Sequence, residues 1–288
     1  MTPEEPSVNL DRAGSDAAEP LVVSEAPASG NETGTGEPEM EAAPAFLAAV
    51  PSAPERDPFW GYSDLLCFAG LAVPSMLAGE GVEWFALMML KLNVASMALR
   101  HVPGMFVGYG LLFGSLHVMF LVRYDRPFWG SLGWKPMRLP ALWVILSGMI
   151  TAILVAVASA LIHTPTGDNP MTQLMETRVD VLVMGALGIT LAPLCEELGF
   201  RGFLQPLLVR SLGAVPGVLL TALPFGLLHY QEYGNSWRHA LIIAVAGAAF
   251  GWMRQATGST KAAVVMHAAY NLLFFIALMT EKRMLPQW

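Results

Sequence analysis

The sequence of 288 residues has few of the residues that build disulfide-linked, zinc-binding or nucleic-acid-binding domains. Its only cysteines are Cys67 and Cys195, and neither stands in a CxxC or Cys/His spacing. This predicts neither a disulfide framework nor a structural zinc site. The HExxH helix motif of zinc peptidases is also missing. Because no basic patch is present, we expect no nucleic-acid partner.

Charged residues are scarce as well. They make up 14% of the chain, against 54% hydrophobic residues, and the mean hydropathy is +0.50. Such a composition is typical of membrane proteins. We therefore predict an all-α fold, a polytopic transmembrane bundle of roughly seven or eight helices that has membrane lipid as a partner. The expected location is the plasma membrane of a prokaryote.

The net charge of −7 is unevenly distributed. Residues 1–57 carry twelve acidic residues and two arginines, whereas residues 58–288 carry eleven acidic and fourteen basic residues. The first segment is rich in Pro, Glu, Ala, Ser and Gly, and such a segment buries too little apolar surface to fold. We expect a disordered acidic tail at 1–57, followed by a multi-span membrane domain at 58–288.

Long apolar runs mark the expected spans of the membrane domain, which are 65–78, 102–122, 139–162, 179–209, 215–230, 240–253 and 261–280. Residues 84–99 contain too many polar side chains for a clear span, and 170–180 is expected to be a short amphipathic helix. The run 179–209 should break near Pro193.

The loop 123–138 contains four basic residues and is the strongest cytoplasmic marker in the chain. Placing it in the cytoplasm also places Arg210 and the 254–261 loop there, in agreement with the same rule. Lys282 and Arg283 would then lie on the other side, which argues against this orientation.

The apolar run 179–209 contains two adjacent carboxylates and a guanidinium, Glu196, Glu197 and Arg201. A charged group inside a membrane is costly and indicates a functional site. Successive helical residues are rotated by about 100°, so the two glutamates cannot share a face. Glu197 and Arg201 are four residues apart and can pair. Glu196 has no such partner on its own helix, and we expect its partner on another helix.

Two later segments offer polar groups that could complete this site. In the first, His229 follows Phe225 by one helical turn, and in the second, Asn271 follows His267 by the same spacing. If these helices all face the interior of the bundle, one pocket contains a carboxylate, two imidazoles and an amide.

This set of groups supports amide hydrolysis by an activated water. Burial makes a carboxylate a stronger base, so Glu196 and His229 could hold and deprotonate a water. His267 and Asn271 would then donate hydrogen bonds to the developing oxyanion. The same groups allow a second interpretation, in which Glu196, His229 and His267 bind a zinc ion. We favour no obligatory metal, because Glu197 is expected to be committed to Arg201 and not to orient a histidine.

The three motifs Glu196-Glu197-x-x-x-Arg201, Phe225-x-x-x-His229 and His267-x-x-x-Asn271 resemble those of the CPBP intramembrane proteases. These are also called CAAX-protease/bacteriocin-processing or Abi proteins, and they are similar to the eukaryotic CAAX prenyl endopeptidase. The resemblance covers about 130–283, which is therefore the expected protease core. It implies a membrane endopeptidase with Glu196, His229, His267 and Asn271 as catalytic residues and Glu197, Arg201 and Phe225 in support.

The resemblance implies a protein or peptide substrate that is cut near its C-terminus, with a prenylated CAAX-like protein as one option. Two other functions stay open at this stage. A non-catalytic membrane partner or immunity-type protein could retain the fold, although the four polar residues argue against this. A proton-coupled transporter could also use buried acids and histidines, but an inverted repeat would be expected in it and none is found.

Overall fold

The computed structural model describes residues 57–91 and 94–280, and the predicted tail at 1–57 lies outside this range apart from Asp57. The described part consists of helices and connecting loops, and it has no strand. Six of its helices are long and apolar enough to cross a membrane. The all-α, multi-span fold class predicted from composition is confirmed.

The first two long helices form an antiparallel pair, α1 (Tyr62–Leu90) and α2 (Met97–Tyr124). Their backbones approach closely because small residues face each other where they cross. A Cβ atom on Gly79 would lie 2.2 Å from the carbonyl oxygen of Gly104, so only glycine permits this packing. The segment 84–99, which the sequence leaves ambiguous, is not one element, because its first part completes α1 and its last part begins α2.

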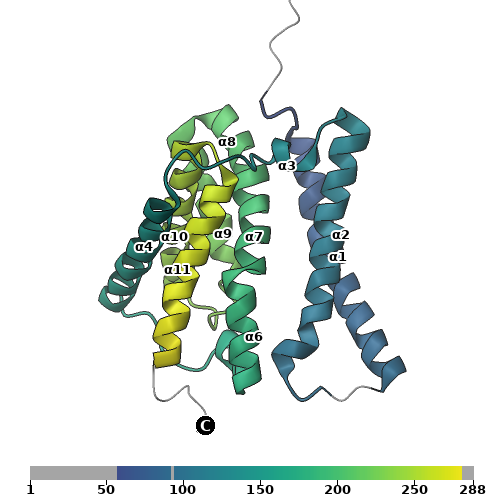
Figure 1. The fold of residues 1–288 in the computed structure, drawn as a ribbon, viewed down its shortest axis with the longest axis vertical. Helices are drawn as coiled ribbons and strands as arrows, with labels where there is room; N and C mark the ends of the chain where they lie inside the picture. Colours follow the sequence, from purple (N-terminus) through teal and green to yellow (C-terminus); the bar gives the residue numbers. More distant parts are fainter. Residues whose placement is uncertain (1–56, 92–93, 281–288) are drawn as a thin grey trace, which may run out of the picture. The chain divides into compact units, whose positions relative to one another are not determined.

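The remaining elements follow in order: α3 (Phe128–Ser131), α4 (Ala141–Leu161), α5 (Pro170–Gln173), α6 (Arg178–Ile189), α7 (Leu191–Glu197), η1 (Leu198–Leu204), α8 (Gln205–Leu212), α9 (Ala214–Leu228), α10 (Trp237–Thr257) and α11 (Thr260–Thr280). The amphipathic helix expected over 170–180 is wrong in extent, because α5 is a single turn and α6 begins only at Arg178. Figure 1 shows α4, α9, α10 and α11 as one group beside the α6–α8 segment.

The run 179–209 is broken twice. The first break lies at Thr190, where α6 ends, three residues before Pro193, so the break predicted near Pro193 is confirmed to within one helical turn. The second irregularity is the π-helical segment η1, which follows Glu197 directly. Inserted π turns are rare and are often found at functional sites.

Two hydrophobic cores hold these helices. One lies between α4, α9, α10 and α11 and includes Val144, Phe225, Phe250 and Met266. The other joins α2 to η1 and α8 through aromatic rings, with Trp60, Phe120 and Phe203 stacked 5.2–5.3 Å apart. The indole nitrogen of Trp60 also donates a hydrogen bond to the carbonyl oxygen of Phe203, inside the π-helical segment.

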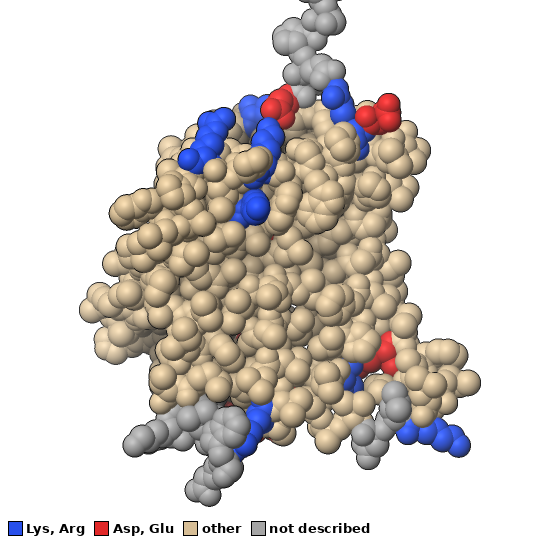
Figure 2. Space-filling model, in the orientation of Figure 1, with Lys and Arg blue, Asp and Glu red and all other residues tan. Residues whose placement is uncertain are grey.

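The loops gather at two ends of this helical part. At one end, Thr260 hydrogen-bonds to the backbone of Leu132 and Gly133, which ties the 125–140 loop to the α10–α11 turn. At the other end, the amide of Met171 donates to the carbonyl of Glu232, so the 162–177 and 229–236 loops meet. In the view of Figure 2, charged side chains lie towards these ends and the surface between them is almost free of charge.

Candidate functional site

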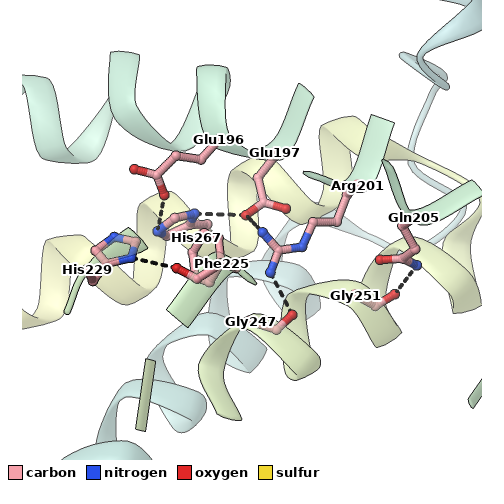
Figure 3. A network of polar contacts seen from close by, with 9 residues as sticks. All are labelled: Glu196, Glu197, Arg201, Gln205, Phe225, His229, Gly247, Gly251 and His267. Carbon is pink, nitrogen blue, oxygen red and sulfur yellow. Dashed lines mark hydrogen bonds and ion pairs between the residues drawn. The ribbon is translucent and has the colours of Figure 1, made fainter. Parts of the chain in front are cut away.

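The site is a row of polar side chains in the middle of the helices, seen in Figure 3. Its members come from the α7–η1–α8 segment, from the C-terminal end of α9 and from α11, and they are Gln205, Arg201, Glu197, His267, Glu196 and His229. The π-helical segment explains part of the alignment. A turn slightly wider than 3.6 residues brings side chains four positions apart closer to one line.

Glu197 lies in the middle of the row, contacts a neighbour on each side and is completely buried. Its Oε1 accepts a hydrogen bond from Nη1 of Arg201 at 2.9 Å, which confirms the ion pair predicted from their spacing. The same oxygen lies 2.9 Å from Nδ1 of His267. Glu197 therefore orients His267 as well, a contact that the sequence did not predict. The expectation that Glu197 would serve Arg201 alone is wrong.

Arg201 is also fully buried and fixed from several sides. Its Nη2 donates to the carbonyl oxygen of Gly247 at 2.7 Å. The guanidinium lies over the ring of Phe225, with 4.3 Å between Cζ and the ring centroid. Gly247 makes this possible, because a Cβ atom there would lie 2.7 Å from Phe225 and 3.0 Å from Arg201. The expected supporting roles of Phe225 and Arg201 thus have a structural basis in packing around one charge.

Glu196 faces away from this pair, as helical geometry requires. Its Oε2 lies 3.9 Å from Nε2 of His267, and its side chain is 22% exposed. Within the described residues, this oxygen is buried and has no hydrogen-bond partner. A buried carboxylate oxygen of this kind is expected to meet water or substrate. The distance to His267 leaves room for a bridging group.

His229 ends α9 and is half-buried. Its Nδ1 lies 2.8 Å from the carbonyl oxygen of Phe225. A carbonyl can only accept, so Nδ1 carries the proton, and Nε2 of the neutral ring is left as an acceptor. In the described residues, no hydrogen bond or ion pair joins His229 to Glu196 directly.

Asn271, which was predicted to donate a hydrogen bond to the oxyanion, makes a different contact in the structure. Its Nδ2 donates to the carbonyl oxygen of Gly188 in α6 at 2.6 Å. One of its two amide protons is therefore used to join α11 to α6, and the second is left for another acceptor. The structure brings Glu196 and His267 together, links His229 to them through Phe225, and gives Asn271 no bond to these three residues.

Glu196, His229 and His267 are the side chains that could bind a metal ion. No group of three or more His, Cys, Asp or Glu side chains is arranged to bind a metal ion anywhere in the described ranges. Nδ1 of each histidine is engaged, by Phe225 for His229 and by Glu197 for His267, which leaves both Nε2 atoms available. Metal-ligating histidines are usually oriented in this way, so the contact between Glu197 and His267 removes the reason for which the sequence disfavoured a metal. Within the described ranges, however, Glu196, His229 and His267 do not converge as a set of three metal ligands.

Two further residues belong to this region, and neither is among the predicted catalytic or supporting residues. Gln205 extends the row by donating from Nε2 to the carbonyl of Gly251 at 2.9 Å. The sequence signal for Gln205 was its position eight residues after Glu197. Tyr233, in the loop after His229, is close enough to Glu232 and Glu196 for their charges to act on it. Burial, with these two charges in addition, raises the pKa of Tyr233 to about 12, so its hydroxyl stays protonated.

A carboxylate and two imidazoles thus lie inside a bundle of helices that are long and apolar enough to cross a membrane. Residues 178–273, one third of the chain, match the family model described as type II CAAX prenyl endopeptidase Rce1-like. The match and the motifs thus agree on a CPBP-type family for residues 178–273, and this family implies a protease. Together with the six apolar helices, it supports an integral membrane protein. No curated protein and no solved structure gives a match.

Proposed function

We propose that this protein is an intramembrane endopeptidase in which Glu196 and His229 activate a water molecule. The observation that carries the proposal is the buried, unpartnered Oε2 of Glu196, which lies opposite Nε2 of His267 inside the segment that matches the protease family. Glu197 also has one oxygen without a hydrogen bond, but its other oxygen binds Arg201 and His267. The side chain of Glu196 makes no hydrogen bond to the described residues, and burying a carboxylate oxygen in this way is costly in a purely structural role.

The first chemical step follows from the hydrogen-bond roles. A water can donate one proton towards Glu196 and the other towards Nε2 of His229, and its oxygen then faces the scissile carbonyl. Glu196 removes one proton as the C–O bond forms. The protonated Glu196 then returns this proton to the nitrogen of the leaving amine as the C–N bond breaks. The products are a carboxylic acid and an amine, as amide hydrolysis requires.

The oxyanion needs donors, and two residues can supply them. Asn271 has one amide proton that is not used by Gly188. His267 already donates Nδ1–H to Glu197, so its Nε2 donates only when the ring carries both protons. The Nδ1 contact with Glu197 fixes the orientation of this ring. The completely buried Glu197 and Arg201 therefore act on the site through His267.

The substrate is proposed to be a membrane-associated protein or peptide. The experiment that tests this proposal compares the wild-type protein with Glu196→Gln after both are reconstituted into liposomes. Each is given a library of membrane-anchored peptides, and the products are identified by mass spectrometry. Glutamine keeps the size of the side chain and removes the base, so cleavage should fall by about 10²–10⁴. An unchanged thermal unfolding temperature is the control for folding.

Two outcomes would change the proposal. A well-folded wild type that cleaves nothing would favour a non-catalytic membrane partner that retains the fold. Cleavage that persists in Glu196→Gln would remove Glu196 as the base. Chelation and elemental analysis of the active protein test the metal alternative. One equivalent of zinc, whose removal abolishes cleavage and whose return restores it, would replace the metal-free mechanism and leave the site residues in place.

A further inference from the structure

A cavity of about 210 Å³ lies between the first described residues, α8 and the last turns of α10. It contains none of the residues that are proposed to act on the substrate, so it is a site separate from the one described above. Its lining residues are Asp57, Pro58, Gln205, Pro206, Val209, Arg210, Arg254 and Gln255.

The walls of this cavity are tied to one another by hydrogen bonds. The guanidinium of Arg210 donates through Nη1 to the carbonyl oxygen of Pro58, and Trp60, two residues further on, is bonded to the backbone of η1. Gln205 in α8 donates to the carbonyl oxygen of Gly251 in α10 at 2.9 Å. The three segments that form the cavity are therefore held together, and the cavity is a preformed part of the fold.

Two guanidinium groups, those of Arg210 and Arg254, dominate the chemistry of the cavity. Arg254 uses Nε to donate to the hydroxyl of Thr260 at 3.0 Å. Each guanidinium has five N–H donors, so most of them are left for a ligand. Among the described residues, neither arginine forms an ion pair with an acidic side chain. Asp57 is the one acidic residue of the lining, so the lining has two positive charges and one negative charge.

The cavity lies where apolar helices end. Arg210 is in the last turns of α8 and Arg254 is in the last turn of α10, and both helices belong to candidate membrane spans. Figure 2 shows a group of Lys and Arg side chains at the end of the molecule where α8 lies in Figure 1. Leu212 and Val215, just after Arg210, are apolar and 49% and 54% exposed. This combination of charge and apolar surface is typical of the level of lipid headgroups.

We propose that this cavity binds the phosphate group of an anionic phospholipid, with Arg210 and Arg254 as the side chains that hold it. Guanidinium groups donate paired hydrogen bonds to phosphate oxygens, and basic pockets between membrane helices suit charged headgroups. The single net positive charge of the lining matches the single negative charge of phosphatidylglycerol. The proposal does not depend on the endopeptidase function.

The lipid would join α8 to α10, and a ligand that binds only the folded state raises the unfolding temperature. The full-length protein is purified in a neutral detergent, freed of lipid, and unfolded thermally while phosphatidylglycerol is added. Phosphatidylcholine at the same mole fraction is the lipid without net charge. Inorganic phosphate at the same concentration tests whether a free anion is sufficient.

Arg210→Gln and Arg254→Gln are made singly and together. Because Arg254→Gln also loses the bond to Thr260, the quantity compared is the shift that the lipid produces within each variant. The matched control is the double variant Lys135→Gln and Lys261→Gln. It removes two positive charges from exposed residues near Thr260 that do not line the cavity.

Saturating phosphatidylglycerol should raise the unfolding temperature of the wild type by about 5 °C. Each arginine variant should need about ten-fold more of this lipid for the same shift, and the double arginine variant about a hundred-fold more. The lysine control should respond as the wild type does. An equal loss of response in the lysine control, or an unchanged response in the double arginine variant, would overturn the site. A shift of the same size with phosphatidylcholine or inorganic phosphate would overturn the assignment to an anionic lipid.

Discussion

The two halves of the polar row place similar groups in opposite surroundings. In the half of the row around Glu197, here called the closed half, Glu197 shares its Oε1 between Arg201 and His267, and all three residues are at most 5% exposed. In the half around Glu196 and His229, here called the open half, the Glu196 side chain is partly exposed and makes no hydrogen bond to the described residues. Two carboxylates that are adjacent in sequence therefore differ in surroundings, because helical rotation turns one towards a fixed cation and the other away from it.

The first prediction breaks the closed half and has the largest expected effect. Glu197→Gln leaves the buried guanidinium of Arg201 without a counter-charge, and such a loss costs about 3–5 kcal/mol of stability. It also removes the negative charge that orients His267. We expect a large fall in the unfolding temperature and in yield, together with reduced cleavage by the protein that remains folded. Thermal unfolding in detergent and single-turnover cleavage measure the two effects.

Glu196→Gln is the matched control, because it changes the neighbouring glutamate in the same way. It should lose cleavage and keep the wild-type unfolding temperature. If Glu197→Gln instead abolishes cleavage in a protein of normal stability while Glu196→Gln stays active, the two glutamates have exchanged roles and the mechanism is wrong.

Much of this difference between the halves was predictable from local sequence. The rotation of about 100° between neighbours separates Glu196 from Glu197, and the spacing of four residues pairs Glu197 with Arg201. The apolar runs predicted the long helices from α4 onwards to within a few residues. Such features depend on helical periodicity alone, which the sequence displays directly.

Contacts between helices were less predictable, because they depend on how the helices pack. The bond from Glu197 to His267 joins residues 70 positions apart, and nothing in either motif specifies their register. The same holds for Asn271, which was expected only at the oxyanion and is bonded to Gly188. The π-helical segment is another case, since the residues of Leu198–Leu204 do not distinguish it from α-helix.

The second prediction compares two side-chain amides, one in each half. Asn271 donates to Gly188 and Gln205 donates to Gly251, each across a helix contact. Asn271→Leu and Gln205→Met remove these bonds with apolar groups of similar size. Both should lose about 1 kcal/mol of stability. Only Asn271→Leu should also lower the cleavage rate, by about 10²–10³, because an oxyanion donor disappears with it.

The measurement is the cleavage rate at saturating substrate, set against the unfolding temperature of each variant. If Asn271→Leu keeps the wild-type rate, Asn271 only joins α11 to α6, and the oxyanion donor must be sought elsewhere. If Gln205→Met loses activity to the same degree at equal stability, the closed half takes a more direct part in catalysis than its burial indicates.

The third prediction tests how tightly the closed half is packed and has the smallest expected effect. Gly247→Ala places a Cβ atom 2.7 Å from Phe225 and 3.0 Å from Arg201. One of them must move, and overpacking of this kind costs about 1–3 kcal/mol. Gly188→Ala is the control near the open half, since its Cβ meets no atom within 4 Å, and it should leave the unfolding temperature unchanged. Cleavage by Gly247→Ala should fall only modestly, because the carbonyl of Phe225 that fixes His229 moves with its ring. Equal unfolding temperatures for the two variants would show that Phe225 or Arg201 moves at a smaller energetic cost than these distances imply.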